Sequence, residues 1–157
     1  MAAETARAVV LAHHADDQAE TFLLMALRGS GVAGLAAMPE VVPLGQGRHL
    51  RPLLGERRAA LLAHAHRHAL APLEDPSNAV LARDRNRIRH ATLPTLSPRW
   101  PHAARSLSRA AAWCAEADVL LGKVLVAQKK PDEALAEFER AVGLEPASVE
   151  HRLVKAT

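Results

Sequence analysis

The first part of the chain follows the order strand, polar segment, helix. Residues 7–12 form a short apolar run rich in β-branched side chains, which is typical of a buried parallel strand. From residue 16 to residue 28 the apolar side chains recur with helical spacing and share one stripe, formed by Ala19, Phe22, Leu23, Ala26 and Leu27. Polar groups therefore follow the carboxyl end of a strand and precede a helix, which is where α/β folds position their ligand sites.

Prolines interrupt the next segment. Pro39 and Pro43 break any long helix in residues 31–47, so this stretch is predicted to be a loop. Residues 49–54 predict a short strand. Because Pro52 lacks the amide proton that a central strand needs, we expect this strand at an edge of the sheet.

A second helix is predicted over residues 56–69, and it carries three histidines at alternate positions, His64, His66 and His68. Two of them could share a face and bind a metal ion. No acidic or cysteine partner is adjacent to them, so we interpret all three as surface positions.

A third helix is predicted after a turn cluster at residues 74–78, where Ser77 or Asn78 can cap it. Four arginines make this helix basic on more than one face, and only Asp84 lies among Arg83, Arg85, Arg87 and Arg89. Two interpretations remain open: a solvated charged helix, or an element that binds phosphate through guanidinium groups. Three prolines end this region, Pro94, Pro98 and Pro101, and a long alanine-rich helix is predicted to begin near His102.

The composition of the 157 residues excludes several classes of protein. A single cysteine excludes a disulfide framework and a cysteine-based zinc site, and it favours a reducing compartment. Aromatic residues make up 3% with no tyrosine, which argues against a base-stacking platform for single strands. No run of 18 apolar residues and no signal-peptide pattern is present, so we expect no membrane association and a cytoplasmic location.

The distribution of charge predicts a junction inside the chain. Residues 1–112 contain 14 arginines, no lysine and 9 acidic residues, a net charge of +5. Residues 113–157 contain 2 arginines, all 4 lysines and 8 acidic residues, a net charge of −2. A simultaneous change in lysine use and in charge sign predicts two segments of different origin, 1–112 and 113–157.

The strand-to-helix junction carries candidate chemistry in the run His13-His14-Ala15-Asp16-Asp17-Gln18-Ala19-Glu20-Thr21. Asp17 and Glu20 fall on one helical face, one turn apart and next to the histidines. Paired carboxylates can hold a divalent cation, bind an ammonium group or perform acid–base work. One alternative is a metal site with His13 and Asp17 as ligands, although no third ligand is evident.

The whole set of motifs resembles the tRNA(Ile)-lysidine synthase family over about residues 5–112. The resemblance rests on the run just quoted and on further blocks in the family's order: Arg28-Gly29-Ser30-Gly31, Gly34-Leu35-Ala36-Ala37-Met38-Pro39, Arg51-Pro52-Leu53-Leu54, Asp75-Pro76-Ser77-Asn78 and Arg85-Asn86-Arg87-Ile88-Arg89. It implies part of a Rossmann-like α/β domain of the PP-loop ATP pyrophosphatases, here a predominantly helical remnant with one or two parallel strands.

The resemblance also implies an activity. Family members use ATP with Mg²⁺ to adenylate the C2 carbonyl of the wobble cytidine in tRNA(Ile), and the amine of free lysine then displaces AMP. Carried over by motif, the residues that line the nucleotide and lysine pocket are His13, Asp17 and Glu20. The substrate- and phosphate-binding residues are then His14, Arg85, Asn86 and Arg89, and no resident metal ligand is implied.

The sequence departs from this family in its phosphate-binding loop and again after about residue 115. The family carries a loop of the form Ser-Gly-Gly-x-Asp-Ser, whose backbone amides hold the ATP pyrophosphate, and this sequence contains no such motif. We therefore expect the chain to be a truncated form that is inactive alone.

From about residue 115 the sequence instead resembles a tetratricopeptide repeat, which implies an all-α helical hairpin. The matching positions are Leu121, Gly122, Ala134, Phe138, Ala141 and Pro146, with a turn at residues 129–132. Two interpretations follow: the helices cap the preceding long helix, or they bind a protein partner in a groove. Arrays of this kind need about three repeats for stability, which favours the first. The alternative function for the chain is a protein-interaction module or a non-catalytic fragment.

Overall fold

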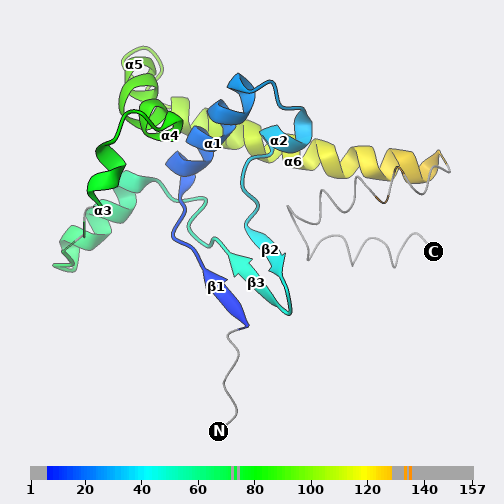
Figure 1. Cartoon of the computed structure of the whole chain (residues 1–157), viewed down its shortest axis with the longest axis horizontal. Coiled ribbons are helices and arrows are strands. Elements are labelled where there is room, and N and C mark those ends of the chain that lie inside the picture. Colours follow the sequence, from blue (N-terminus) through cyan, green and yellow to red (C-terminus); the bar gives the residue numbers. More distant parts are fainter. Residues whose placement is uncertain (1–6, 72, 74, 129–132, 134, 136–157) are drawn as a thin grey trace, which may run out of the picture.

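A computed structural model describes residues 7–71, 73, 75–128, 133 and 135 of the chain. The strands are β1 (Ala8–Val10), β2 (Val41–Leu44) and β3 (Gly47–Leu50). The α-helices are α1 (Ala15–Leu27), α2 (Val32–Leu35), α3 (Arg58–Arg67), α4 (Asp84–Arg87), α5 (Leu93–Leu96) and α6 (Ala103–Ala127). A 3₁₀ turn, η1, spans Pro76–Ala79, and a π-helical turn, η2, spans Ile88–Thr92. Figure 1 shows α6 as the longest element, with the small sheet to one side of it.

Over the described part of the chain, the sheet has three strands in the order β1-β3-β2. β1 pairs parallel with β3, with Val9 opposite His49, and β2 pairs antiparallel with β3, with Val42 opposite His49. The predicted parallel strand near residues 7–12 is thus present over three residues. Its predicted burial is wrong, because β1 lies at an edge of the sheet and all three of its residues are exposed in the described part of the chain. Because β1 and β3 run in the same direction, their carboxyl ends meet at one edge of the sheet.

The predicted loop at residues 31–47 is wrong, because α2 and β2 both lie in it. Pro43 is part of β2, and an edge strand can hold a proline because one of its sides needs no amide donor. The strand expected at 49–54 ends at Leu50 and lies in the centre of the sheet, so its prediction as an edge strand is also wrong. Pro52 lies beyond the strand and therefore does not restrict its pairing.

Helix α1 begins and ends within one residue of its predicted bounds. His14 is its N-cap and forms a capping box with Asp17, which satisfies two backbone amides at the start of the helix. The helix ends at Leu27 with Arg28 as its C-cap, and Gly29 follows with φ of +72°, the left-handed conformation that glycine adopts without steric cost.

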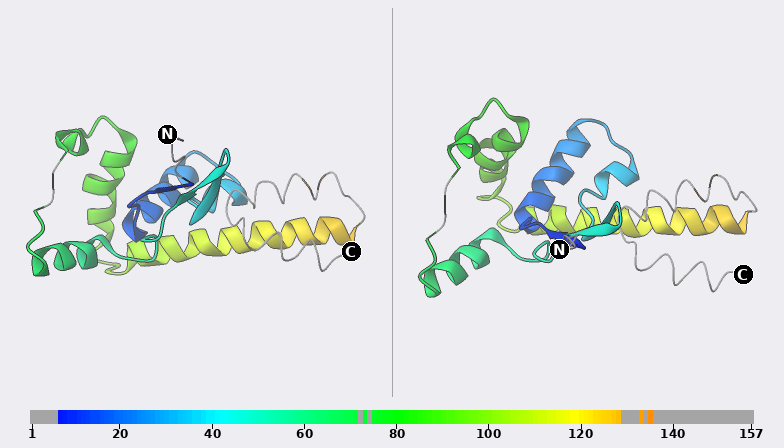
Figure 2. Two further views of the ribbon diagram at one scale, coloured as in Figure 1. Left: turned by 90° about the horizontal axis from the view of Figure 1, so that it is seen from below. Right: turned by 60° about the horizontal axis from the view of Figure 1, so that its bottom comes forward.

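The packing of α6 organises the rest of the chain. Both views of Figure 2 show α6 as a long rod that runs past α1 and the sheet. Its most extensive contacts are with α1 and then with α2. Small side chains line these contacts, since the fully buried apolar residues include Ala19, Ala36 and Ala111. Alanines let helix axes approach closely, so α1, α2 and α6 can pack with short side chains between them.

The segment that carries the four arginines, residues 83–96, is called the basic segment below, and it is less regular than predicted. After η1, the elements α4, η2 and α5 follow one another without a break from Asp84 to Leu96. Pro94 was expected to end this region, but it lies in the first turn of α5, directly after the π-helical turn. Proline has no amide proton to donate within this continuous helical segment, which agrees with its position next to the irregular π-helical turn.

Helix α3 buries little surface. Leu61 and Leu62 are half-buried, whereas His64, His66 and His68 are all exposed, as predicted. The rings of His64 and His68 lie one above the other with centroids 4.4 Å apart.

The predicted boundary between residues 112 and 113 falls inside α6, which continues through it as one helix. Gly122 is buried in α6. Most of the proposed repeat, including the turn at 129–132 and its positions Ala134, Phe138, Ala141 and Pro146, lies outside the described residues. The two-segment organisation therefore stays a prediction. Of the helices that the structure describes, none combines the length and the apolar character needed to cross a membrane.

Candidate functional site

The candidate site lies at the carboxyl edge of the parallel pair β1–β3. His13 and His14 follow β1, and Arg51 follows β3. The amide of Ala15 donates a hydrogen bond of 2.8 Å to the carbonyl of Glu56, which fixes the start of α1 beside the segment that leads into α3. This edge is where open α/β sheets bind their ligands.

His14 is the N-cap residue of α1 and forms hydrogen bonds with the first turn of the helix. Its backbone amide donates to Oδ2 of Asp17 at 2.9 Å, and its Nδ1 accepts from the backbone amide of Asp17 at 3.3 Å. These two bonds hold the Asp17 carboxylate at the first turn of the helix, facing the basic segment. In the structure His14 therefore orients Asp17 through these hydrogen bonds. That His14 binds substrate stays a prediction.

Asp17 and Glu20 on α1 meet Arg85 and Arg89 of the basic segment. Glu20 accepts from Nε of Arg89 at 2.7 Å, from Nη2 of Arg89 at 2.9 Å and from Nε of Arg85 at 3.0 Å. Oδ1 of Asp17 accepts from Nη2 of Arg89 at 2.8 Å and from Nη2 of Arg85 at 3.3 Å. The sequence-predicted residues from two distant segments thus form one connected group, which we call the charge cluster.

Burial makes the pairing in the charge cluster necessary. Glu20 is 1% exposed and Asp17 is 7% exposed, and an ionised carboxylate is stable at such depth only when it is paired and hydrogen-bonded. The hydrogen bond to Glu20 raises the pKa of Arg89, although burial opposes this. Two carboxylates face two guanidinium groups, so the cluster is neutral overall. Every carboxylate oxygen in it accepts at least one hydrogen bond.

His13 lies beside the cluster as a neutral ring. Its Nδ1 accepts a hydrogen bond of 3.3 Å from Nε of Arg51, which requires an unprotonated nitrogen. Burial lowers the pKa of His13, and the positive charges of Arg51 and Arg85 act in the same direction, against the attraction of Asp17. A neutral imidazole at this edge can accept or relay a proton.

The structure does not bring Asn86 into the charge cluster. Its side-chain amide donates to the carbonyls of Ser77 and Val80, each at 2.9 Å, and the side chain is buried. Asn86 therefore ties η1 and the residue after it to α4. Arg83 and Arg87, on the same segment, are exposed.

Asp16 and Arg57 form a second ion pair that sequence reasoning missed. Arg57 donates to both oxygens of Asp16 at 2.8 to 3.2 Å, and the backbone amide of Arg58 donates to Oδ2 at 2.8 Å. Asp16 thereby caps α3 from another helix. Burial raises the pKa of Asp16, but the bonds from Arg57 and Arg58 outweigh it and hold that pKa below its ordinary value. No local sequence signal joins residues 41 positions apart.

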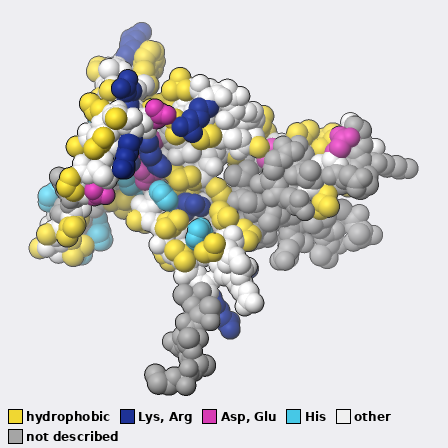
Figure 3. All heavy atoms as spheres, in the orientation of Figure 1, with side chains coloured by type: hydrophobic (Ala, Val, Ile, Leu, Met, Phe, Trp, Pro, Cys, Tyr) yellow, Lys and Arg dark blue, Asp and Glu magenta, His cyan; other side chains and the backbone are white. Residues whose placement is uncertain are grey.

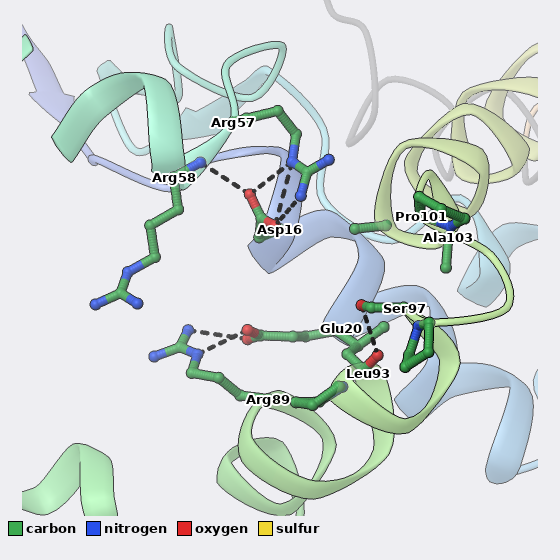
Figure 4. A pocket seen from close by; sticks show the side chains of 12 residues that line it. Asp16, Glu20, Arg57, Arg58, Arg89, Leu93, Ser97, Pro101 and Ala103 are labelled. Carbon is green, nitrogen blue, oxygen red and sulfur yellow. Dashed lines mark hydrogen bonds and ion pairs between the residues drawn. The ribbon is translucent and has the colours of Figure 1, made fainter. Parts of the chain in front are cut away.

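A pocket of about 600 Å³ opens between the two ion-pair groups. In Figure 4, Asp16 with Arg57 lies on one side of it and Glu20 with Arg89 on the other. The remaining wall is largely apolar and comes from α5, the turn after it and the start of α6: Leu93, Pro94, Ser97, Pro98, Pro101, Ala103 and Ala104.

The described residues do not fit a bound metal ion. No group of three histidine, cysteine, aspartate or glutamate side chains with suitable spacing occurs in the part of the chain that the structure covers. The alternative site at His13 and Asp17 finds no third ligand there, and the oxygens of Asp17 already accept hydrogen bonds.

Comparison with known proteins agrees with the motifs. The PP-loop domain family matches residues 1–96. The chain is 51% identical over 136 residues to a tRNA(Ile)-lysidine synthase of Alkalilimnicola ehrlichii, covering 85% of this chain and 31% of that protein. It is 53% identical to the tRNA(Ile)-lysidine synthases of Xanthomonas campestris pv. campestris strain 8004, over 113 residues, and of Methylococcus capsulatus, over 116 residues. These matches cover 72% and 74% of this chain and 26% of each relative.

The chain thus spans between a quarter and a third of the length of these relatives. The similarity to the Alkalilimnicola protein is long enough to continue past residue 112, into the segment that the charge pattern sets apart. The resemblance predicted from the motifs is confirmed, and the chain belongs to the PP-loop domain family.

Proposed function

We propose that the chain is the site-bearing part of an ATP-dependent ligase that joins lysine to C2 of the wobble cytidine in tRNA(Ile). The observation that carries this proposal is the charge cluster of Asp17, Glu20, Arg85 and Arg89. It lies at the carboxyl edge of a parallel strand pair, in a chain about half identical to enzymes named for this reaction.

Within this proposal the carboxylates orient the lysine amine and accept its proton as the new carbon–nitrogen bond forms at C2 and the bond from C2 to the departing AMP breaks. Both carboxylates are satisfied by arginines, so an incoming ammonium group has to displace a guanidinium group. Arg85 is the more exposed partner, at 38% against 23% for Arg89, and it is the one that can swing into solvent. The neutral ring of His13 lies beside the cluster and can relay that proton onward from the carboxylate.

ATP with Mg²⁺ belongs to the proposal through the family alone. The sequence has no Ser-Gly-Gly-x-Asp-Ser motif, and the described residues contain no metal-ligand group. We therefore infer that the chain does not adenylate RNA by itself, and that the charge cluster acts with a pyrophosphate loop supplied by further sequence or by another chain.

Two assays test the proposal together. The purified chain is assayed for ATP–pyrophosphate exchange and for incorporation of labelled lysine into tRNA(Ile), and we expect neither above background. Residues 7–112 are then exchanged into the matching region of the Alkalilimnicola relative, and we expect this chimera to incorporate lysine.

The matched control is the same chimera with Glu20→Gln, which keeps the side-chain shape and removes the negative charge. We expect lysine incorporation to fall by at least about a hundredfold, the scale of a positioned acid–base group. A folded chimera without activity, or an unimpaired Glu20→Gln chimera, contradicts the proposed function.

A further inference from the structure

Arg58 is the one cation lining the pocket whose side chain has no partner among the described residues. Arg57 is paired with Asp16, and Arg89 with Glu20 and Asp17. The guanidinium group of Arg58 forms no hydrogen bond or ion pair with any residue in the described ranges, and the side chain is exposed. Three arginines and two carboxylates line the pocket, so Arg58 supplies its excess positive charge.

The base of the Arg58 side chain is held in place. The backbone amide of Arg58 donates to Oδ2 of Asp16 at 2.8 Å, at the first residue of α3. From this position the side chain extends toward the guanidinium group of Arg89 (Figure 4). Nη1 of Arg89 is likewise without a partner among the described residues. Two guanidinium edges thus border one pocket, and an oxygen-rich anion can accept from both.

The pocket wall formed by α5 and the turn after it favours a ligand with an apolar part. Leu93, Pro94, Pro98 and Pro101 present aliphatic surface across from the arginines. A ribonucleotide fits this division, because its phosphate needs donors while its base and ribose can lie against apolar side chains.

The surroundings favour a polymer over a small free anion. The pocket is open to solvent, and the stretch of chain that supplies Arg89 carries further exposed arginines, at Arg83 and Arg87 before it and at Arg99 after it. Figure 3 shows Lys and Arg side chains gathered over the side of the molecule that carries α4 and α5. Several exposed cations on one stretch of chain suit a nucleic-acid backbone, which carries many phosphates, whereas a free amino acid uses only one of them.

We propose that Arg58, with the outer edge of Arg89, forms a phosphate subsite for an RNA nucleotide that neighbours the reacting one. The subsite deepens the proposed function and rests on it. Arg58 positions the RNA and takes no part in the chemistry.

The test measures binding of the complete chain to the anticodon stem–loop RNA of tRNA(Ile) by fluorescence anisotropy at several NaCl concentrations. Each lost phosphate contact is expected to reduce the slope of log K against log[NaCl] by about 0.7 to 0.9. We expect Arg58→Ala to show this reduction and about a three- to tenfold weaker affinity at moderate salt. Arg58→Lys should keep most of the slope because the charge remains.

The matched control is Arg67→Ala, an exposed arginine at the other end of α3 that does not line the pocket. It should leave the slope unchanged, and circular dichroism should show that both alanine variants keep the wild-type helix content. If the wild-type chain binds the RNA and Arg58→Ala binds with the same slope, the subsite is wrong while the proposed function stands.

Two further outcomes overturn the subsite in distinguishable ways. If the wild-type chain does not bind the RNA at low salt, both the subsite and the RNA-directed function of this chain fail. If calorimetric titration with free lysine shows binding that Arg58→Ala abolishes while RNA binding is unchanged, the pocket takes the amino acid and the phosphate assignment is wrong.

Discussion

Glu20 shows how a single side chain can connect segments far apart in the sequence. It lies on α1, and both arginines that donate to it come from a segment more than 60 residues later. Its position one turn after Asp17 was readable from the sequence, because residues three apart share a helical face. The near-complete burial of Glu20 could not be predicted from the sequence, since it depends on where the basic segment packs.

We predict that Glu20→Ala lowers the free energy of unfolding by about 3 kcal/mol, because two partly buried guanidinium groups then share the single carboxylate of Asp17. Urea denaturation followed by circular dichroism measures this. Asp84→Ala is the control, since it removes an exposed ion pair with Arg28 and should cost less than about 1 kcal/mol. Equal losses in the two variants would contradict a buried, stability-determining cluster.

Asp16 gives the stability of the chain a dependence on pH. The pKa of Asp16 is lower in the folded chain than its ordinary value of 3.8. The unfolded chain therefore binds more protons between these two pKa values. The contribution of Asp16 is fully present above about pH 3.8 and is lost as the pH falls through the folded pKa.

We predict that Asp16→Asn lowers the free energy of unfolding by about 1 to 2 kcal/mol at pH 7, since the charge-assisted bonds from Arg57 are weakened. Urea titrations of both proteins between pH 2 and pH 7 measure the difference. The two curves should converge at low pH, where wild-type Asp16 is itself protonated. A difference that stays constant down to pH 2 would show that the charge of Asp16 is not responsible.

Among the elements, α1 contacts the largest variety of others, since it packs against α6, α2, α4 and η2. Its capping box, its apolar stripe and the glycine after it all act within a few residues, so its bounds could be predicted to within one residue. The elements α2 and β2 have four residues each, too few for a periodic pattern, and they were predicted as loop. β2 forms because β3 lies beside it, which local sequence does not encode.

Gln18 joins α1 to the segment after α2 through two hydrogen bonds with the backbone of Met38. Its Nε2 donates to the carbonyl of Met38 at 2.7 Å, and its Oε1 accepts from the amide of Met38 at 2.8 Å. We predict that Gln18→Ala costs about 2 to 3 kcal/mol, because both polar groups of Met38 lose their partner. Hydrogen exchange should show the Met38 amide losing protection while the amides in the middle of α1 keep theirs. Unchanged protection of the Met38 amide would argue against its hydrogen bond to Gln18.

For the molecule as a whole, the close approach of α1 and α6 decides where the charge cluster lies. Ala19 on α1 and Ala111 on α6 are both fully buried. A larger side chain at either position has to push the helices apart.

We predict that Ala111→Leu lowers the free energy of unfolding by about 1 to 3 kcal/mol through overpacking. Ala112→Leu is the matched control, because Ala112 is exposed and the same side chain can enter solvent there. Thermal and urea unfolding compare the two. A well-folded Ala111→Leu chain as stable as the control would show that α6 does not pack closely at this residue.

Motifs and spacing along single elements were enough to predict the family, the position of the first strand, α1 and the candidate residues Asp17, Glu20, Arg85 and Arg89. Which charges face one another became visible in the folded chain alone. Tertiary packing placed Asn86 in a structural role, joined Asp16 to Arg57, and left Arg58 unpaired among the described residues at the mouth of a pocket. The physical reason is that charge pairing depends on distances across space, and these are set by the packing of small side chains between helices.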